Sequence, residues 1–446
     1  MADKLLVRVY DVGLGDCILC RIPKAREHDG RLVDFHMLID CGTWSEGALL
    51  TAALDNLADL LPDVGDGRSR LDLLVVTHEH KDHISGIDPD AFKRFKIEAI
   101  WMNAAMNPEH RQAEQTQRLH SFATRAMRGV AAQGLALDPE IQDLVELFSI
   151  DNSGAMEALR ETLPRANGIA PRYVHAGQTN DDLDLSLTGA KLRVLGPEDD
   201  IDGFYLGQQA QTAFASFAAV AGEGDEVASP PEKLPENIGP ADFRQLRSRM
   251  LGNAFAFAAL SSKVTNNTSV VLLLEWSGKR LLFVGDAEWD TRFKKGKSNG
   301  AWNVMWNERR PLLAEPIDFL KIGHHGSENA TPWADPEARQ AEEPATILDA
   351  ILPLPVGSTR PLATAVVSTR RSKYKTIPRG QLMVEIGRRV GSTRNYEALL
   401  GHAGVNVAEL PRYAEFEKDW IGQPQPIRTD IERVLSDRRF VDVELE

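Results

Sequence analysis

Residues 77–83, with the sequence THEHKDH, place three histidines and two acidic side chains within seven positions. They follow LDLLVV, an apolar and partly β-branched run that predicts a buried strand. Alternate residues His78 and His80 can converge on one cation, while the adjacent Asp82 and His83 can turn toward a second. Imidazole nitrogen and carboxylate oxygen suit zinc, and also manganese or iron. The spacing therefore predicts a site for two divalent metal ions at the end of a strand.

Asp286 ends a second strand-like run. Residues 268–286, TSVVLLLEWSGKRLLFVGD, predict a hairpin of two apolar strands around Ser277 and Gly278. A two-metal site needs a bridging anion that holds the cations about 4 Å apart, and Asp286 is the natural candidate. A metal-bound water loses its proton near neutral pH, which supplies a nucleophile without serine or cysteine. We therefore expect a metal-dependent hydrolase that uses a metal-bridging hydroxide, with Asp286 as the bridge and Asp82 steering the attacking hydroxide.

The rest of the chain alternates strand-like and helix-like patterns, which is typical of an α/β fold. Three β-rich runs near the start precede a helical pattern over residues 46–61. Helical patterns over about 107–170 and 204–262 predict two insertions that carry no visible chemistry. A C-terminal extension begins at about residue 380. We expect one hydrolase domain over residues 1–446, enlarged by these segments.

Composition limits the classes of partner. The formal net charge of −14 disfavours a broad electrostatic grip on nucleic acid, because such binding depends on neutralising phosphates with Lys and Arg. Two basic runs, RFKKGK at 292–297 and RRSKYK at 370–375, reverse the sign locally. No signal peptide and no run of 18 apolar residues is visible, so no membrane contact is expected. Three cysteines are too few for a disulfide framework, and a cytoplasmic location is expected.

Several motifs in the same order resemble the metallo-β-lactamase superfamily, and more narrowly the hydrolase domain of the DNA-uptake protein ComEC and its soluble relatives. The motifs are DVGLGD at 11–16, LIDCG at 38–42, THEHKDH at 77–83, NNTSVVLLLEWSGKRLLFVGDAE at 266–288 and LKIGHHGS at 320–327. They span most of residues 5–375. The resemblance implies a four-layer αβ/βα sandwich with helical insertions, and two metal ions at one edge of two facing sheets. Zinc is the expected metal and manganese the alternative.

The resemblance also assigns further site residues. Asp40, which ends the LIDCG strand, is implied to orient a metal ligand without binding metal itself. Asp16 either acts in the same way or caps the DVGLG turn. The family's final histidine falls within HHGS, where His324 comes first after the strand and is our choice, with His325 as the alternative. Asn267 occupies the position of a histidine ligand in most of the superfamily, and as a weaker neutral ligand it leaves the metal identity open.

The region after VVST suggests how a substrate is held. Ser368 is followed by the basic run that contains Arg371, Lys373 and Tyr374. These side chains are expected to hold a phosphate beside the metals, because an anchored anion gains both position and charge neutralisation. ComEC-like sequences tend to have a His-Pro pair next, whereas this chain has Ile377-Pro378.

The leading hypothesis is therefore a phosphodiesterase or nuclease acting on nucleic acid or a nucleotide. A short single strand or a cyclic nucleotide reconciles this substrate with the acidic net charge. The first alternative is a hydrolase of a carboxylic ester, lactone, amide or thioester, because fold and metals do not select the electrophile. The second alternative is a metal-binding regulatory component whose helical insertions dock a protein partner. The oligomeric state is open.

Two other patterns favour packing over chemistry. Cys17 and Cys20 form a CxxC pattern, but in a strand residues three apart face opposite sides and cannot clamp one metal. Trp302 and Trp306 lie close to the first basic run, and an aromatic and basic patch for single strands is the less favoured interpretation.

Overall fold

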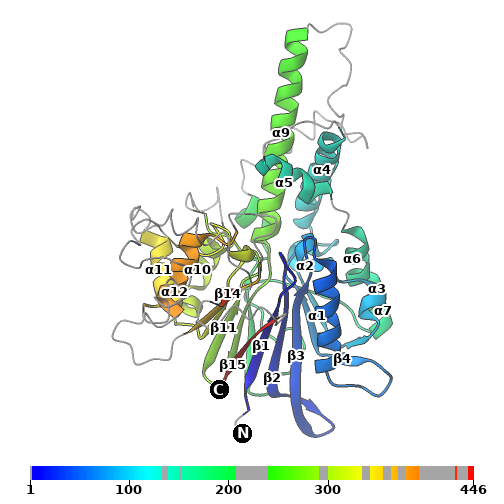
Figure 1. The fold of residues 1–446 in the computed structure, drawn as a ribbon, viewed down its shortest axis with the longest axis vertical. Helices are drawn as coiled ribbons and strands as arrows, with labels where there is room; N and C mark the ends of the chain where they lie inside the picture. The colour runs from blue at the N-terminus through cyan, green and yellow to red at the C-terminus, as the bar shows by residue number, and fades with distance from the viewer. Residues whose placement is uncertain are drawn as a thin grey trace.

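Two mixed β-sheets face each other and helices cover their outer faces (Figure 1). The computed structural model describes residues 3–132, 139–149, 152–206, 240–290, 300–333, 342–354, 363–369, 377–390, 427–428 and 440–446. The arrangement is the αβ/βα sandwich expected from the sequence motifs. None of the helices in the described ranges combines the length and apolar character needed to span a bilayer.

The first sheet has the strand order β15-β1-β2-β3-β5-β7-β8. Its strands are β1 (Leu5–Tyr10), β2 (Cys17–His28), β3 (Arg31–Cys41), β5 (Leu73–Val76), β7 (Ile100–Asn103), β8 (Arg172–Val174) and β15 (Phe440–Leu445). The segment from β3 to β8 is parallel, whereas β15 pairs antiparallel with β1 at the sheet edge. Arg8 of β1 donates to Asp442 of β15 at 2.7 Å. The two ends of the chain are therefore neighbouring strands, as Figure 1 shows.

The second sheet has the order β14-β13-β12-β11-β10-β9. Its strands are β9 (Ala190–Gly196), β10 (Val271–Trp276), β11 (Lys279–Phe283), β12 (Phe319–Lys321), β13 (Thr364–Val367) and β14 (Ile427–Arg428). The predicted hairpin is confirmed as β10 and β11, and its turn residues Ser277 and Gly278 have φ of 49° and 78°. Positive φ at both central positions gives the turn the twist that matches two paired strands. Strands β11, β12 and β13 run parallel, so their carboxyl ends meet at one edge.

A core of aliphatic and aromatic side chains joins the two sheets. Val9, Ile39 and Val75 of the first sheet pack in the same buried cluster as Leu272 and Phe283 of the second. Cys17 and Cys20 lie in different clusters on opposite faces of the first sheet, and all three cysteines are buried and free. The packing interpretation of the CxxC pattern is therefore confirmed.

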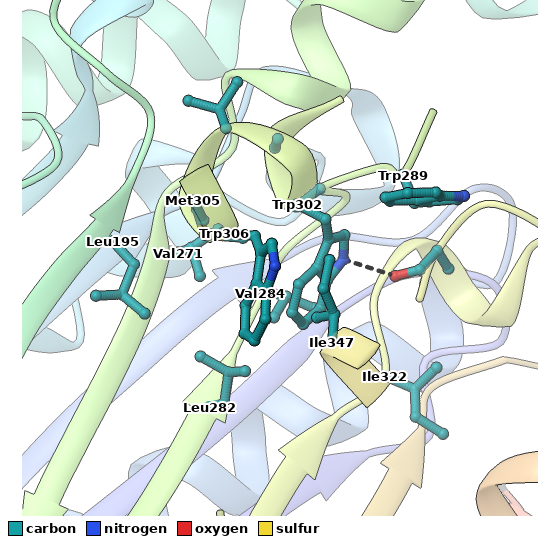
Figure 2. Packing of buried hydrophobic residues seen from close by; sticks show 14 of the residues in the cluster. Leu195, Val271, Leu282, Val284, Trp289, Trp302, Met305, Trp306, Ile322 and Ile347 are labelled. Carbon is teal, nitrogen blue, oxygen red and sulfur yellow. Dashed lines mark hydrogen bonds between the residues drawn. The ribbon is translucent and has the colours of Figure 1, made fainter. Parts of the chain in front are cut away.

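Helices form the two outer layers. On the first sheet, α1 (Gly47–Leu60) buries Leu50, Leu54 and Leu57. The second sheet is covered by α10 (Ala301–Leu313), α11 (Glu342–Ile351) and α12 (Gly380–Val390). Figure 2 shows Trp302 and Trp306 packed in this layer, where the Trp302 indole donates to the Ala330 carbonyl at 3.1 Å. Both tryptophans are buried, which confirms their packing role.

Helices from the two predicted insertions project beyond one edge of the sandwich (Figure 1). Helices α4 (Ala113–Ala131), α5 (Pro139–Ser149) and α9 (Pro240–Asn267) share a small core that includes Met127, Phe148 and Ala258. The last residues of α9 precede β10 directly, so the insertion is anchored beside the strand ends. The remaining short elements are α2 (Lys81–Ile84), α3 (Pro89–Phe92), α6 (Ser153–Glu157), α7 (Leu163–Asn167), β4 (Ser69–Leu71), β6 (Phe95–Ile97), η1 (Ala104–Met106), η2 (Ala158–Thr162), η3 (Asp202–Leu206) and η4 (His324–Gly326).

Candidate metal centre

Among the described residues, three groups of potential metal-binding side chains lie at the strand ends of the two sheets, and the third, Asp16, Asp40 and His83, shares His83 with the second. The first group is His78, His80 and Asp286, and the second is Asp82, His83 and His325. Within each group the ligand atoms lie within 4.8 Å of one another, and all of these residues are buried. The first sheet supplies the THEHKDH residues, while the second supplies Asp286 after β11 and His325 after β12. The site therefore exists only where the two sheets meet.

The first group is preorganised by the hydroxyls around His78. Its Nε2 lies 3.1 Å from Nδ1 of His80 and 3.6 Å from Oδ2 of Asp286. Its Nδ1 lies 3.1 Å from the Thr77 hydroxyl, which donates its own proton to Asp40 at 2.7 Å. Because a threonine has one hydroxyl proton, the proton between Thr77 and His78 belongs to the imidazole Nδ1. The lone pair on Nε2 of His78 is left to face a cation.

In the second group, backbone and carboxylate acceptors orient both imidazoles. His83 donates from Nδ1 to Oδ2 of Asp40 at 2.8 Å and presents Nε2 to Oδ1 of Asp286 at 3.2 Å. His325 donates from Nδ1 to the Ser368 carbonyl at 3.0 Å and presents Nε2 to Oδ2 of Asp82 at 3.0 Å. Such partners fix the tautomer and the ring direction of metal-binding histidines.

Asp286 spans the two groups with its two carboxylate oxygens. Oδ2 faces His78 and Oδ1 faces His83. Its backbone N–H donates to the Ser269 hydroxyl at 3.1 Å. The preceding Gly285 has φ of 52°, and a Cβ there would lie 2.9 Å from Cβ of Ser269. A side chain at this position would push Asp286 away from the first group.

The donor set fits two divalent cations. Nε2 of His83 and Oδ1 of Asp286 are buried, and neither meets hydrogen-bond geometry with any described group. Two ligands of one tetrahedral zinc ion stand about 3.4 Å apart, given bonds of about 2.0–2.1 Å. The separations of 3.1 and 3.6 Å in the first group, and of 3.0 Å between His325 and Asp82, bracket that value.

Burial and neighbouring charge divide the histidines by protonation state. Burial lowers the pKa of His78 well below its usual value and lowers the pKa of His80 to about 4. Burial also lowers the pKa of His83, but the charges of Asp286 and Asp40 outweigh it and the pKa is raised. The hydrogen bond to Asp82 likewise outweighs burial and raises the pKa of His325. In the metal-free protein at neutral pH, the two histidines of the first group are therefore neutral, whereas those of the second group hold protons that a metal ion must displace.

Asp16 and Ser368 form a buried network behind His325. The Asp16 carboxylate lies 2.9 Å from Nζ of the buried Lys321 and accepts the Ser368 hydroxyl proton. Burial raises the pKa of Asp16, but the charges of Lys321, His325 and His83 and the Ser368 hydrogen bond together outweigh it, and the pKa is lowered. The DVGLG turn is held instead by Asp11, which accepts from Gly13 at 3.2 Å. Of the two predicted roles for Asp16, the contacts favour support of the His325 side of the site.

The structure separates the roles of His324 and His325. Both follow β12 in η4, but Nε2 of His325 faces Asp82, whereas Nε2 of His324 lies 3.8 Å from Oδ2 of Asp286. Our choice of His324 as the final ligand therefore does not match the geometry of the second group, which contains the alternative, His325. The two residues have φ of 41° and 51°, which swings consecutive side chains to different sides of the loop.

Asn267 does not face the first group as a free ligand. Its Oδ1 accepts from the backbone N–H groups of Ala301 at 2.6 Å and Glu288 at 3.2 Å. Its Nδ2 donates to the Lys263 carbonyl at 2.8 Å and to Oε2 of Glu288 at 3.3 Å. These bonds occupy both lone pairs of the amide oxygen, so the expected metal ligation by Asn267 conflicts with its contacts.

The predicted phosphate-binding loop is only partly described. Ser368 is buried and contacts Asp16, as above. Arg371, Lys373 and Tyr374 lie outside the described residues, so their role stays a prediction. Lys321, Ser269 and Glu288 were not predicted as site residues, although all three lie inside the motifs quoted above. Their position as polar residues at or next to the ends of apolar strands could have identified them.

The family model of the metallo-beta-lactamase superfamily matches residues 31–156. The matched stretch runs from β3 to α6 and contains THEHKDH, whereas Asp286 and His325 lie outside it. No curated protein matches the chain. The superfamily consists mostly of hydrolases, so the match and the two ligand groups together support a metal-dependent hydrolase. The narrower resemblance to ComEC-like proteins stays a prediction.

Proposed function

We propose that the chain is a two-metal phosphodiesterase that acts on a short single strand or a nucleotide, with zinc or manganese as the metal. The observation that carries the proposal is the Asp286 carboxylate, whose two oxygens face His78 and His83 in separate ligand groups. A carboxylate in this position is suited to hold two cations about 4 Å apart, the separation at which both can act on one phosphate.

The residues around those cations have different roles. Bound divalent cations lower the pKa of a coordinated water and stabilise negative charge on phosphate oxygens. Asp82 is suited to orient the attacking water, because its carboxyl stays ionised: burial raises its pKa, but the hydrogen bond from His325 and the charge of His83 lower it further. Asp40 and the Ser368 carbonyl hold the second-group imidazoles in register.

The phosphodiester part of the proposal rests on the positive charge of a run that follows β13 in the sequence. The basic run at 370–375 directly follows Ser368 and Thr369, which are buried at the end of β13. An anionic substrate gains both position and neutralisation from such a run. The net charge of −14 disfavours long duplex DNA, which is why we propose a small substrate. Carboxylic esters, lactones, amides and thioesters remain the alternative substrates for the same centre.

The first experiment combines metal content with hydrolysis of bis-p-nitrophenyl phosphate. We expect about two zinc or manganese ions per chain, and loss of both metal and hydrolysis in a His80→Ala, Asp82→Ala double variant. His28→Ala is the matched control, because His28 is exposed at the β2–β3 turn, where its ring forms an ion pair with Asp29. A protein that holds little metal and shows no variant-sensitive hydrolysis would rule out the two-metal proposal.

A second comparison tests the substrate class. Neutralising Arg371, Lys373 and Lys375 to glutamine should raise KM for a dinucleotide at least tenfold and leave KM for p-nitrophenyl acetate unchanged. If the wild type cleaves the carboxylic ester and no phosphodiester, the metal centre stands and the phosphodiester assignment fails.

A further inference from the structure

His324 is a second strand-end histidine that the second ligand group does not use. It lies in η4, one residue before His325, and its side chain is 26% exposed. Its Nδ1 is buried and has no hydrogen-bond partner among the described residues. Both histidines hold the left-handed backbone conformation, with φ of 41° and 51°. Such conformations are unfavourable outside glycine and are retained where a site needs the geometry.

We propose that His324, oriented by Glu288, is the fourth ligand of the metal position formed by His78, His80 and Asp286. The inference rests on the metal centre of the proposed function and not on its substrate. The first group has three protein donors, whereas a four-coordinate zinc site needs a fourth ligand or a water. Asn267 cannot supply it, because both lone pairs of its amide oxygen accept backbone N–H groups.

The His324 ring lies beside the first ligand group. Its Nε2 lies 3.8 Å from Oδ2 of Asp286, the same oxygen that faces His78 at 3.6 Å. Ligands of one tetrahedral zinc ion stand about 3.4 Å apart, so Nε2 is already near that spacing from Asp286. His324 lies outside the group whose donor atoms are within 4.8 Å of one another, so its ring must also turn toward His78 and His80 to share their cation. The partly exposed ring can make this turn, whereas Nε2 of His325 is already bonded to Asp82.

Glu288 is a buried carboxylate beside the other nitrogen of the His324 ring. It is 6% exposed, and its Oε1 lies 3.5 Å from Nδ1 of His324. Oε1 also accepts from Nδ2 of Asn266 at 2.8 Å, and Oε2 accepts from Asn267 at 3.3 Å. A proton on Nδ1 directed at Glu288 leaves the Nε2 lone pair facing Asp286. At 3.5 Å the two groups are close without a hydrogen bond, and the turn of the ring that brings Nδ1 onto Oε1 would let Glu288 orient His324 as Asp40 orients His83.

The two histidines of η4 thus serve different metal positions, His324 the first and His325 the second. Asn266 and Asn267 hold the carboxylate that orients His324, and they are positioning residues. This division explains why two consecutive residues adopt the left-handed conformation, since neighbouring side chains must reach opposite sides of Asp286.

The test measures zinc binding without turnover. Apo protein is titrated with Zn²⁺ in competition with a chromophoric chelator, and bound zinc is counted by elemental analysis. We expect His324→Gln to weaken one zinc position at least tenfold and to spare the other. Glu288→Gln should weaken the same position about 10–100-fold, the usual effect of losing a ligand's orienting partner. The double variant should be no weaker than His324→Gln, because Glu288 acts through His324.

Cobalt spectra and folding controls distinguish metal binding by His324 from other roles of this residue. One equivalent of Co²⁺ in the wild type and in His324→Gln should give different visible spectra, whereas a histidine that only donates a proton to substrate would leave spectrum and zinc affinity unchanged. His28→Ala should match the wild type, and urea midpoints of the apo variants identify any that fail to fold. Two zinc ions at wild-type affinity in His324→Gln and His324→Ala would overturn the inference. A wild type that binds two zinc ions but cleaves no phosphodiester would overturn only the proposed function.

Discussion

Gly42→Ala should detach the second metal position from the first. A Cβ on Gly42 would lie 2.5 Å from backbone carbon atoms of Asp82 and His83, the two ligands carried by α2. Carbon atoms in contact stand about 3.5–4.0 Å apart, so α2 must retreat by about 1 Å. Metal sites tolerate errors of about 0.2 Å in ligand distances. We therefore expect the second zinc ion to bind at least 100-fold more weakly, while His78, His80 and Asp286 retain the first.

The measurement is zinc per chain at controlled free Zn²⁺, with urea unfolding of the apo protein beside it. Overpacking of this kind costs about 1–3 kcal/mol in the free energy of unfolding. Gly47→Ala is the control, because Gly47 begins α1 and no atom lies within 4 Å of a Cβ built there. If Gly42→Ala bound two zinc ions with wild-type affinity and an unchanged urea midpoint, the argument that backbone contact with Gly42 positions α2 would be refuted.

Three further outcomes follow from buried ionisable groups. Burial lowers the pKa of His80 to about 4, whereas the pKa of His83 is raised, because neighbouring carboxylates outweigh burial. The pKa of His325, in the same position, is raised as well. At pH 7 filling the second position should therefore release protons, whereas filling the first should release almost none. The affinity of the second position should fall as pH falls, while the first position keeps its affinity until near pH 4. Calorimetry in buffers of different ionisation enthalpy that gave equal proton release for both would contradict this. Lys321→Met leaves the buried Asp16 carboxylate without its cation. Urea unfolding should show that the free energy of unfolding falls by about 3–5 kcal/mol and is partly restored when Asp16→Asn is added. An unchanged urea midpoint would show that the ion pair is not stabilising. Burial raises the pKa of Cys20 to about 12, so the folded protein should not react with Ellman's reagent at pH 8, and rapid labelling before unfolding would show that the thiol is accessible.

The sequence was most informative where one short segment carries both the donors and their geometry. In THEHKDH, His80 is extended and α2 begins at Lys81, and His78 and His80 belong to one group while Asp82 and His83 belong to the other. That division was predicted from spacing alone. Strand patterns likewise predicted the β10–β11 hairpin and the placement of Asp286 at a strand end.

Contacts between distant segments were not predictable in this way. β15 pairs with β1 although they stand at opposite ends of the chain, and nothing in FVDVEL names its partner. The choice between His324 and His325 depends on two backbone angles that neither side chain dictates. Asn267 was assigned as a ligand by its position in a motif, whereas its actual partners come from α10 and from Glu288.

The accuracy of the metal centre therefore comes from backbone contacts between the sheets as much as from donor chemistry. A Cβ on Gly285 would meet Cβ of Thr77 at 3.0 Å, and one on Gly323 would meet the Gly285 carbonyl at 2.7 Å. These close approaches let the ends of β5, β11 and β12 converge around Asp286. Interiors packed at this density transmit small displacements and do not absorb them. The donors of THEHKDH and their division could be predicted from the sequence, but the placement of Asp286 between the two groups is decided where glycine allows the strand ends to touch.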